Sequence, residues 1–298
     1  MEEIIKLDNI AKYNAMRGVE TLNPLVTVID LSRAKAMAAK TFNFGLYAVF
    51  LKELNCGELK YGRNHYDYQE GTFVFIAPGQ VMGIQRNVKT FEPKGWALLF
   101  HPDLIKGTAL GKHIEEYSFF SYDVNEALHL SEKERQIVLD CFGKIQYELE
   151  QSMDKHSKKL IASNIELFLN YCTRFYDRQF ITRDQANNGI LERFENLLNN
   201  YFSSESPANI GLPSVAYCAE KLNLSSNYFG DLIKKETGKS AQEYIQSKII
   251  DVAKERIFDH NKTVSEIAYD LGFKYPQHFT RLFKQRIGIT PIEYRNLN

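Results

Sequence analysis

One stretch near the C-terminus carries hydrogen-bonding side chains on one side of a predicted helix. Over residues 276–287 the apolar residues Phe279, Leu282 and Phe283 recur with helical spacing, and the polar residues fall on the other side. The polar residues are Gln277, His278, Arg281 and Lys284. An arginine can bind a guanine edge through two hydrogen bonds, and a glutamine can bind adenine in the same way. The face therefore has the chemistry to read bases in a major groove.

A second, shorter helix precedes this face and would position it. Thr263 and Glu266 have the spacing of a capping box, which predicts a helix start. The apolar stripe that follows is Val264, Ile267, Ala268 and Leu271. Gly272 is expected to end this helix, because the residue there must adopt a positive φ. Pro276 suits the first position of the next helix, since it has no N–H to leave unpaired. The pattern predicts a helix-turn-helix.

The same pattern occurs upstream, which makes it an internal repeat. Its first apolar stripe is Val215, Cys218, Ala219 and Leu222. A turn over Asn223–Ser225 follows, and then a predicted helix with Phe229, Leu232 and Ile233 on one face. Ser214 precedes its counterpart Thr263 by 49 residues, whereas Phe229 precedes Phe279 by 50. The second turn is therefore expected to be one residue longer. Two matched halves are stronger support for the assignment than either half alone.

The repeat resembles the DNA-binding region of the AraC/XylS family of bacterial transcription regulators, over about a hundred residues. The resemblance rests on Lys234 to Gly238 (KKETG) and on Ala268, Gly272, Phe273, Phe279, Arg281, Phe283, Lys284, Gly288, Pro291 and Tyr294. It implies an all-α domain of two helix-turn-helix segments joined by a long helix, which binds double-stranded promoter DNA.

The resemblance also implies roles for individual residues. Base contacts are expected from Asn227, Tyr228, Asp231, Gln277, His278 and Arg281. Phosphate contacts are expected from Ser225, Ser226, Lys234, Lys235 and Lys284. Asp231 has two interpretations, because it can accept from cytosine but also repels phosphate; the alternative is that it is solvated or pairs locally. Phe273, Phe279 and Phe283 are expected in the core.

Between the two halves, Ser240 and Glu243 form another capping box and open a connecting helix that is predicted to run to about Phe258. About nineteen residues at about 1.5 Å each give a helix of about 28 Å. That length can hold two reading helices about one DNA turn apart. Upstream, a helix is predicted over Ile190–Phe202 and a loop over Ser203–Pro213.

Composition limits the alternatives. The chain has 298 residues, 25% of them charged, and its net charge is zero. From Asn188 onward there are fourteen Lys/Arg and thirteen Asp/Glu, a net charge of +1, so DNA binding would depend on placed charges rather than on a general basic field. No apolar run is long enough for a membrane span, and the acidic, polar start does not resemble a signal peptide. Cytoplasmic localisation is expected. Four scattered cysteines, Cys56, Cys141, Cys172 and Cys218, are expected as buried free thiols.

Residues 1 to about 125 show short apolar runs separated by turn residues, which predicts an all-β barrel or sandwich over about 22–125. The runs are Leu25–Leu31, Gly45–Leu51, Thr72–Ile76 and Ala97–Phe100. The segments Gly62–Gly79 and Trp96–Leu104 resemble the cupin-like jelly roll found at the N-terminus of many AraC-type regulators.

Some cupins are metalloenzymes, so the metal-binding pattern was sought in these segments. His65 is followed by Tyr66 and Asp67, which gives no second histidine at the required spacing, and Glu70 falls in a predicted turn. The residues after Pro78-Gly79 contain no histidine either. Three or four such ligands are needed to hold a metal. We therefore expect no metal, no other cofactor and no catalytic residues, and His65 is expected on a strand, facing solvent or a small-molecule cavity.

Helical periodicity begins at Ser131. Two amphipathic helices are predicted over about 131–177, and they either pack on the barrel or also pair with a second subunit. The polar stretch 179–189 is predicted as a linker. It would separate an N-terminal domain, 1–178, from the DNA-binding domain, 190–298. The fold class is therefore predicted as α+β.

The functional expectation is a sequence-specific DNA-binding transcriptional regulator that is not an enzyme. By family tendency it would be an activator that works with RNA polymerase, as a homodimer, and its N-terminal domain would sense a small molecule, dimerise, or both. The residues that would bind such an effector are unknown. Two alternatives stay open: a cupin-type enzyme or small-molecule-binding protein with an accessory helical domain, and a regulator whose barrel only dimerises.

Overall fold

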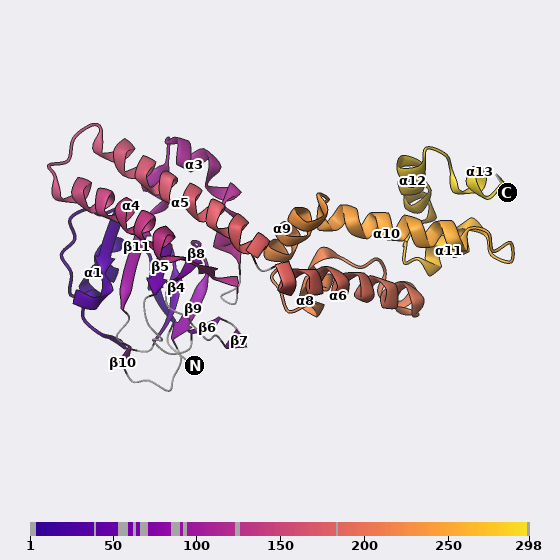
Figure 1. Ribbon diagram of the computed structural model, residues 1–298, viewed down its shortest axis with the longest axis horizontal. Helices are drawn as coiled ribbons and strands as arrows, with labels where there is room; N and C mark the ends of the chain where they lie inside the picture. Colours follow the sequence, from indigo (N-terminus) through magenta and orange to yellow (C-terminus); the bar gives the residue numbers. More distant parts are fainter. Residues whose placement is uncertain are drawn as a thin grey trace. The chain divides into compact units, whose positions relative to one another are not determined.

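The computed structural model describes residues 4–38, 40–52, 59–61, 64–65, 71–84, 90–91, 94–122, 126–182 and 184–296. The chain divides into two compact units, Met1–Thr182 and Arg183–Asn298, which we call the N-terminal and C-terminal units (Figure 1). In the described part of the chain, every strand belongs to the N-terminal unit, and the C-terminal unit is built from helices. The predicted α+β class is confirmed.

The N-terminal unit contains two five-stranded sheets and a short two-stranded one. The first sheet has the order β1-β4-β9-β6-β7, the second β12-β8-β5-β11-β2, and the short one β10-β3. The strands are β1 (Ile4–Leu7), β2 (Val26–Asp30), β3 (Met37–Ala38), β4 (Thr41–Phe44), β5 (Tyr47–Lys52), β6 (Leu59–Tyr61), β7 (Asn64–His65), β8 (Thr72–Ile76), β9 (Val81–Ile84), β10 (Thr90–Phe91), β11 (Gly95–Phe100) and β12 (Leu128–His129). The four predicted apolar runs correspond to β2, β5, β8 and β11, and these four form adjacent members of the second sheet.

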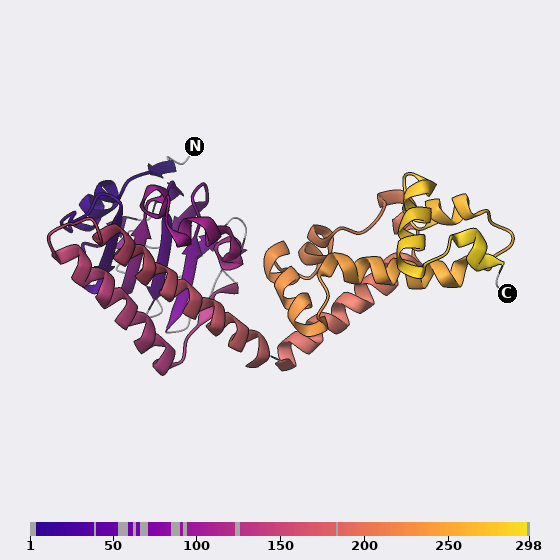
Figure 2. The same ribbon diagram turned by 90° about the horizontal axis from the view of Figure 1, so that it is seen from above.

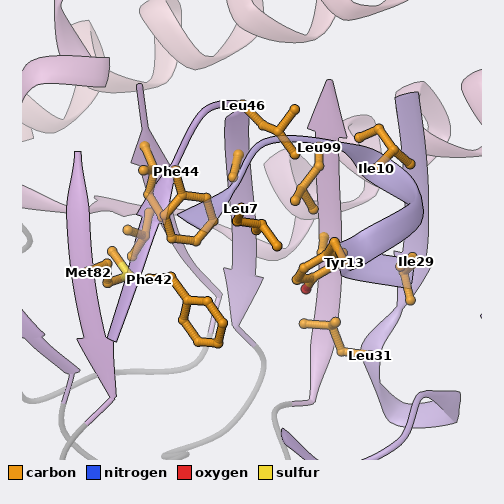
Figure 3. Close-up of a cluster of buried hydrophobic side chains, with 14 residues drawn as sticks. Leu7, Ile10, Tyr13, Ile29, Leu31, Phe42, Phe44, Leu46, Met82 and Leu99 are labelled. Carbon is orange, nitrogen blue, oxygen red and sulfur yellow. The ribbon is translucent and has the colours of Figure 1, made fainter. Parts of the chain in front are cut away.

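The core of this unit lies between the two large sheets (Figure 3). Phe42, Phe44 and Met82 contribute from the first sheet, and Ile29 and Leu99 from the second. Helix α1 (Ile10–Arg17) adds its buried residues Ile10 and Tyr13 to the same cluster. Strand residues alternate between the two faces of a sheet, so the side chains that do not enter this cluster face the other way.

The outer face of the second sheet is covered by α4 (Glu132–Glu150) and α5 (Ser157–Thr182), as Figure 1 shows. Phe73 on β8 contacts Phe142 of α4 and Phe168 of α5, with ring centroids 6.3 and 5.5 Å apart. Helix α4 begins with a capping box between Ser131 and Glu134, in which both hydrogen bonds are present. Both helices therefore pack on the second sheet, and the interpretation that one of them also pairs with a second subunit stays open.

Two boundaries differ from the sequence-based expectation. The first sheet begins with β1, which pairs in parallel with β4, so the sheets start near residue 4 and not near residue 22. The predicted linker 179–189 contains the end of α5 and the start of α6 (Asp184–Ser203), and the two units divide inside it, after Thr182. Polar composition alone did not distinguish a linker from the polar end of a helix.

The remaining helices of the N-terminal unit are short and lie between β11 and β12. They are α2 (Pro102–Ile105), α3 (Ala109–His113) and two 3-10 turns, with a third such turn at Leu31–Arg33. His101 is the N-cap of α2. His65 lies on β7, as predicted, whereas Cys56, Asp67 and Glu70 are outside the described residues.

Three of the four cysteines, Cys141, Cys172 and Cys218, are buried free thiols, as predicted. Burial raises the pKa of the Cys218 thiol to about 11, so this group stays protonated at neutral pH. Over the described ranges, no three His, Cys, Asp or Glu side chains are grouped so that they could hold a metal ion. In the same described ranges, no helix has the length and apolarity of a membrane span.

Candidate nucleic-acid interface

The second helix-turn-helix consists of α11 (Val264–Asp270) and α12 (Pro276–Ile287). Both hydrogen bonds of the predicted Thr263–Glu266 capping box are present at the start of α11. The Thr263 N–H and hydroxyl donate to the Glu266 carboxylate and hold its pKa below the usual value. Gly272 has a φ of 94°, as its predicted place after the helix requires. Pro276 occupies the first turn of α12.

The first helix-turn-helix consists of α8 (Val215–Lys221) and α9 (Ser226–Thr237). Ser214 caps α8 and Ser225 caps α9, each accepting a hydrogen bond from a backbone N–H three residues later. In the turn, Asn223 has a φ of 59°, and it is the one non-glycine residue with positive φ in the described part of the chain. Asparagine tolerates this conformation better than other side-chain-bearing residues.

The two halves keep the predicted register. Ser214 and Thr263, 49 residues apart, are both N-caps, and Gly238 and Gly288, 50 residues apart, both end a reading helix in the left-handed conformation. Four residues separate α8 from α9 and five separate α11 from α12, so the second turn is one residue longer, as the sequence indicates.

The shared aromatic residues are core residues, as predicted. Phe229 of α9 contacts Phe194 of α6 at a ring separation of 4.9 Å. Phe279 of α12 contacts Phe273 at 5.4 Å and Phe283 at 5.7 Å. All of these rings are buried. Each reading helix is therefore anchored by its apolar face, and its polar face is left outward.

The outward face of α12 carries every residue that the sequence assigned to it. Gln277, His278, Arg281 and Lys284 are all exposed. Their spacing of three and four residues places neighbours on one side of the helix. The Arg281 side chain has no hydrogen bond or ion pair with any described residue. Arg286, on the same helix, instead donates to Gln246 at 2.6 Å.

Helix α12 also has a feature that the sequence analysis did not single out. Its N-cap, Tyr275, makes no side-chain capping hydrogen bond, so the first N–H groups of α12 are left without a side-chain acceptor. Tyr275 is 56% exposed, and its ring lies 5.5 Å from that of His278. The one sequence feature that could have indicated this role for Tyr275 is its place directly before Pro276. Tyr275 extends the polar face to the start of the helix.

On α9 one of the predicted base contacts, Tyr228, is buried. This residue is only 5% exposed. The reason is the width of the apolar stripe: Tyr228, Phe229, Leu232 and Ile233 are all buried, whereas α12 buries only Phe279 and Phe283. A tyrosine at this position joins the core, while the histidine at the equivalent position of α12 does not.

The other residues predicted on α9 are accessible to different degrees. Asn227, Ser226, Lys234 and Lys235 are exposed. Asp231 is half-buried and already has an interaction partner. Ser225 is half-buried, and its hydroxyl accepts from the Tyr228 N–H at 3.2 Å. The polar face of α9 is therefore narrower than that of α12.

Helix α10 (Ala241–Arg256) runs between the two halves (Figures 1 and 2). Its predicted capping box, Ser240 and Glu243, is present. The helix is shorter than expected: sixteen residues give about 24 Å, against the predicted 28 Å. The residues that follow α10 contact α13 (Pro291–Arg295): Arg295 donates to the Ile257 carbonyl at 2.6 Å, and Phe258 contacts Tyr294.

Comparison with known proteins finds similarity in this unit. Residues 218–297 match the sequence family described as "Helix-turn-helix domain". The "Uncharacterized HTH-type transcriptional regulator YtdP" of Bacillus subtilis (strain 168) is 39% identical over 77 residues, which are 26% of this chain and 10% of that protein. YobQ of the same organism, described in the same words, is 38% identical over 69 residues, which are 23% of this chain and 29% of that protein.

A solved structure with similarity to this chain is the C-terminal domain of the two-component response regulator yesN from Fusobacterium nucleatum subsp. nucleatum ATCC 25586. It has 29% sequence identity, covers 35% of this chain and 95% of that chain, and gives a TM-score of 0.31. The similarity to the two Bacillus proteins spans less than a third of either of them.

Proposed function

We propose that the C-terminal unit of this chain is a DNA-binding domain of the AraC/XylS type and that the chain is a sequence-specific transcription regulator. Helices α9 and α12 would enter successive major grooves of one promoter. The observation that carries this proposal is the exposed face of α12, where Gln277, His278, Arg281 and Lys284 lie opposite the buried rings of Phe279 and Phe283.

Chemical roles can be proposed for these residues. Arg281 would bind a guanine edge bidentately and Gln277 an adenine edge. Lys284 and Lys234, at equivalent positions of the repeat, would contact phosphate. The N-terminus of α12, which has no side-chain cap, would bind a further phosphate through the Gln277 N–H and the positive end of the helix dipole. On α9, Asn227 would be the main base contact.

In vitro selection from a random duplex library with the purified chain tests this proposal. We expect a bipartite site, because two reading helices on one rigid helix would select two half-sites about one helical turn apart. A pool that stays random after selection would contradict the proposal. Arg281→Ala should relax the selected sequence at one base pair, while the control Arg286→Ala, whose guanidinium donates to Gln246, should select the same site.

We further propose that the N-terminal unit is cupin-like and that it dimerises, senses a small molecule, or does both. Support for dimerisation comes from the outward face of α5, where Leu160 and Leu167 are 46% and 40% exposed and are spaced by seven residues. A second copy of α5 is the occupant that such a stripe would fit. The regulator would act in the cytoplasm as an activator that recruits RNA polymerase, a role that rests on family tendency.

Dimerisation has a direct test in analytical ultracentrifugation. Leu167→Asp should convert a dimer into a monomer, because the charge would be desolvated in the interface. Leu22→Asp is a suitable control, since Leu22 is an exposed leucine of the same unit that lies outside α5. A wild-type chain that sediments as a monomer, or a Leu167→Asp variant that stays dimeric, would contradict this interface.

A further inference from the structure

Each of the two turns of the repeat contains a residue with positive φ, but the residue type differs between them. Asn223 in the first turn and Gly272 in the second are 49 residues apart and follow the C-caps Leu222 and Leu271. Both have a positive φ, 59° and 94°. The first turn shows that a side chain is compatible with this place in the motif. Positive φ alone therefore does not explain why the second turn has glycine.

The second turn has glycine because there is no room for a Cβ atom at this position. A Cβ atom added to Gly272 would lie 2.6 Å from the carbonyl carbon of Gly211, 2.7 Å from its oxygen and 3.0 Å from the Leu212 nitrogen. All three atoms are backbone, so the contact can be relieved only by moving a chain segment. Gly211 follows α7 (Ser206–Ile210), a short helix within the segment that the sequence predicts as a loop, and α7 packs on α11.

Gly211 is itself held in place. Its φ and ψ are 98° and −156°, a conformation that is open almost only to glycine. Its carbonyl accepts a hydrogen bond from the Tyr201 hydroxyl at 2.8 Å, which ties it to the last turn of α6. The second turn thus rests directly on a backbone segment that is anchored to α6, and α6 also packs on α9 of the first helix-turn-helix.

An arginine bridges the same two parts of the unit. Arg256, at the end of α10, donates to the Phe202 carbonyl on α6 and, at 3.4 Å, to the Asp270 carbonyl on α11. Both carbonyls lie in the last turn of their helices, where a cation is favoured by the helix dipole. The glycine contact and this bridge act at the same junction.

We propose that the Gly211–Gly272 contact, with Arg256 as its bridge, fixes the second helix-turn-helix at one position relative to the first and so sets the half-site spacing that the protein accepts. This inference rests on the proposed function, since spacing has meaning only if both reading helices bind DNA. Gly211, Gly272 and Arg256 are positioning residues that do not touch DNA themselves.

The test uses the full chain and the bipartite duplex selected by the wild-type protein. Affinity is measured on that duplex, on versions with one base pair inserted or deleted between the half-sites, and on a version that keeps only the half-site of the second helix-turn-helix. A rigid protein should lose about 10- to 100-fold on a one-base-pair change, because the second contact is no longer linked productively to the first. Gly272→Asn should bind the selected duplex more weakly and should lose less than about 3-fold further on the altered spacings.

The matched control is Gly288→Asn. Gly288 has a φ of 93°, almost equal to that of Gly272, but no atom lies within 4 Å of an added Cβ. It carries the same backbone strain without the collision, and it should keep the wild-type spacing penalty. Arg256→Met is a second, milder variant, which removes the bridge and keeps the side-chain stem. It should shift the spacing preference in the same direction.

A general loss of structure would lower binding to every duplex alike, including the single half-site, and would leave the ratio between spacings unchanged. The proposal is therefore overturned if Gly272→Asn and Arg256→Met keep the wild-type ratio between spacings, or if Gly288→Asn relaxes it equally. Failure of the proposed function would be seen earlier and separately, as a wild-type chain that selects no duplex at all.

Discussion

Helices α9 and α12 occupy equivalent positions in the two halves of the C-terminal unit, and they present different surfaces. Helix α12 carries Arg281, Lys284 and Arg286 and no acidic residue, whereas α9 carries two lysines and two acids, Asp231 and Glu236. Tyr228 and His278 occupy equivalent positions, but Tyr228 is buried and His278 is exposed. Asp231 of α9 occupies the position that is equivalent to Arg281 of α12.

This difference indicates a division of labour between two halves with the same scaffold. Each good bidentate base contact contributes about 1–3 kcal/mol of discrimination, and an acid near phosphate reduces the general attraction. The second helix-turn-helix should therefore supply most of the affinity and most of the discrimination. The first should act chiefly as a phosphate clamp through Lys234, Lys235 and the start of α9.

The largest expected effect concerns the scaffold that the halves share. Phe229→Ala and Phe279→Ala should each lower the free energy of unfolding of the C-terminal unit by about 3–5 kcal/mol, because each leaves a cavity in a packed core. Circular dichroism should report the loss. The fluorescence of Trp96, the chain's one tryptophan, reports the N-terminal unit and should be unchanged. A loss confined to one of the two variants would show that the halves are not equivalent in their cores.

The next largest effect concerns base reading. Arg281→Ala should weaken binding to the selected duplex by about 1–3 kcal/mol and relax preference at one base pair. Asn227→Ala lies in the first helix-turn-helix, which is proposed to contribute less to base recognition. It should weaken binding less than Arg281→Ala does. A competition titration with single-base variants of the duplex measures both. An equal or larger loss from Asn227→Ala would remove the proposed asymmetry.

Phosphate contacts should be a point of similarity. Lys234→Ala and Lys284→Ala, at equivalent repeat positions, should each weaken all sequences alike and reduce the slope of log affinity against log salt by about one. The measurement is a salt series on a selected and an unrelated duplex. A loss of affinity that depends on one base pair would instead identify Lys284 as a base contact.

The smallest effect concerns helix capping. In the capping box of α11, the Thr263 backbone N–H and hydroxyl donate to the Glu266 carboxylate and hold its pKa below the usual value, whereas the equivalent residue of α8 is Tyr217, which has no carboxylate. A carboxylate with a lowered folded-state pKa stabilises the fold above its unfolded pKa, and this stabilisation is lost as the pH falls through the folded pKa. Glu266→Gln should therefore flatten the decline of the melting temperature as the pH falls below the usual glutamate pKa. Tyr217→Phe should leave that decline unchanged.

The repeat was predictable from the sequence because its determinants are local. Capping boxes, apolar stripes and the turn residues Asn223 and Gly272 lie within a few positions of the helices that they define. The burial of Tyr228 was not predictable from the sequence. Tyr228 and Leu232 are four residues apart and face the same side of α9, but only the packing of the helix shows that this side is buried. The exposed polar set on α12 was predicted in full, while Tyr275 was missed.

Contacts between distant segments were beyond the sequence. The contact of Gly211 with Gly272 joins residues 61 positions apart, and the parallel pairing of Ile4–Leu7 with Thr41–Phe44 joins an N-terminal strand to a later one. Neither leaves a periodic signal. In the N-terminal unit, four strands of the second sheet were predicted because each contains a run of apolar residues. The first sheet includes short strands that have no such run, and this signal did not identify them.

The central claim, that the second helix-turn-helix dominates, is tested most directly by one pair of variants at one repeat position. Asp231→Ala and Arg281→Ala are titrated with the same selected duplex at a low and a high salt concentration. The account predicts a loss of about 1–3 kcal/mol for Arg281→Ala at both salts, and unchanged or tighter non-specific binding for Asp231→Ala. If Asp231→Ala is the more damaging variant at both salts, the first helix-turn-helix is the main reader and the account is wrong.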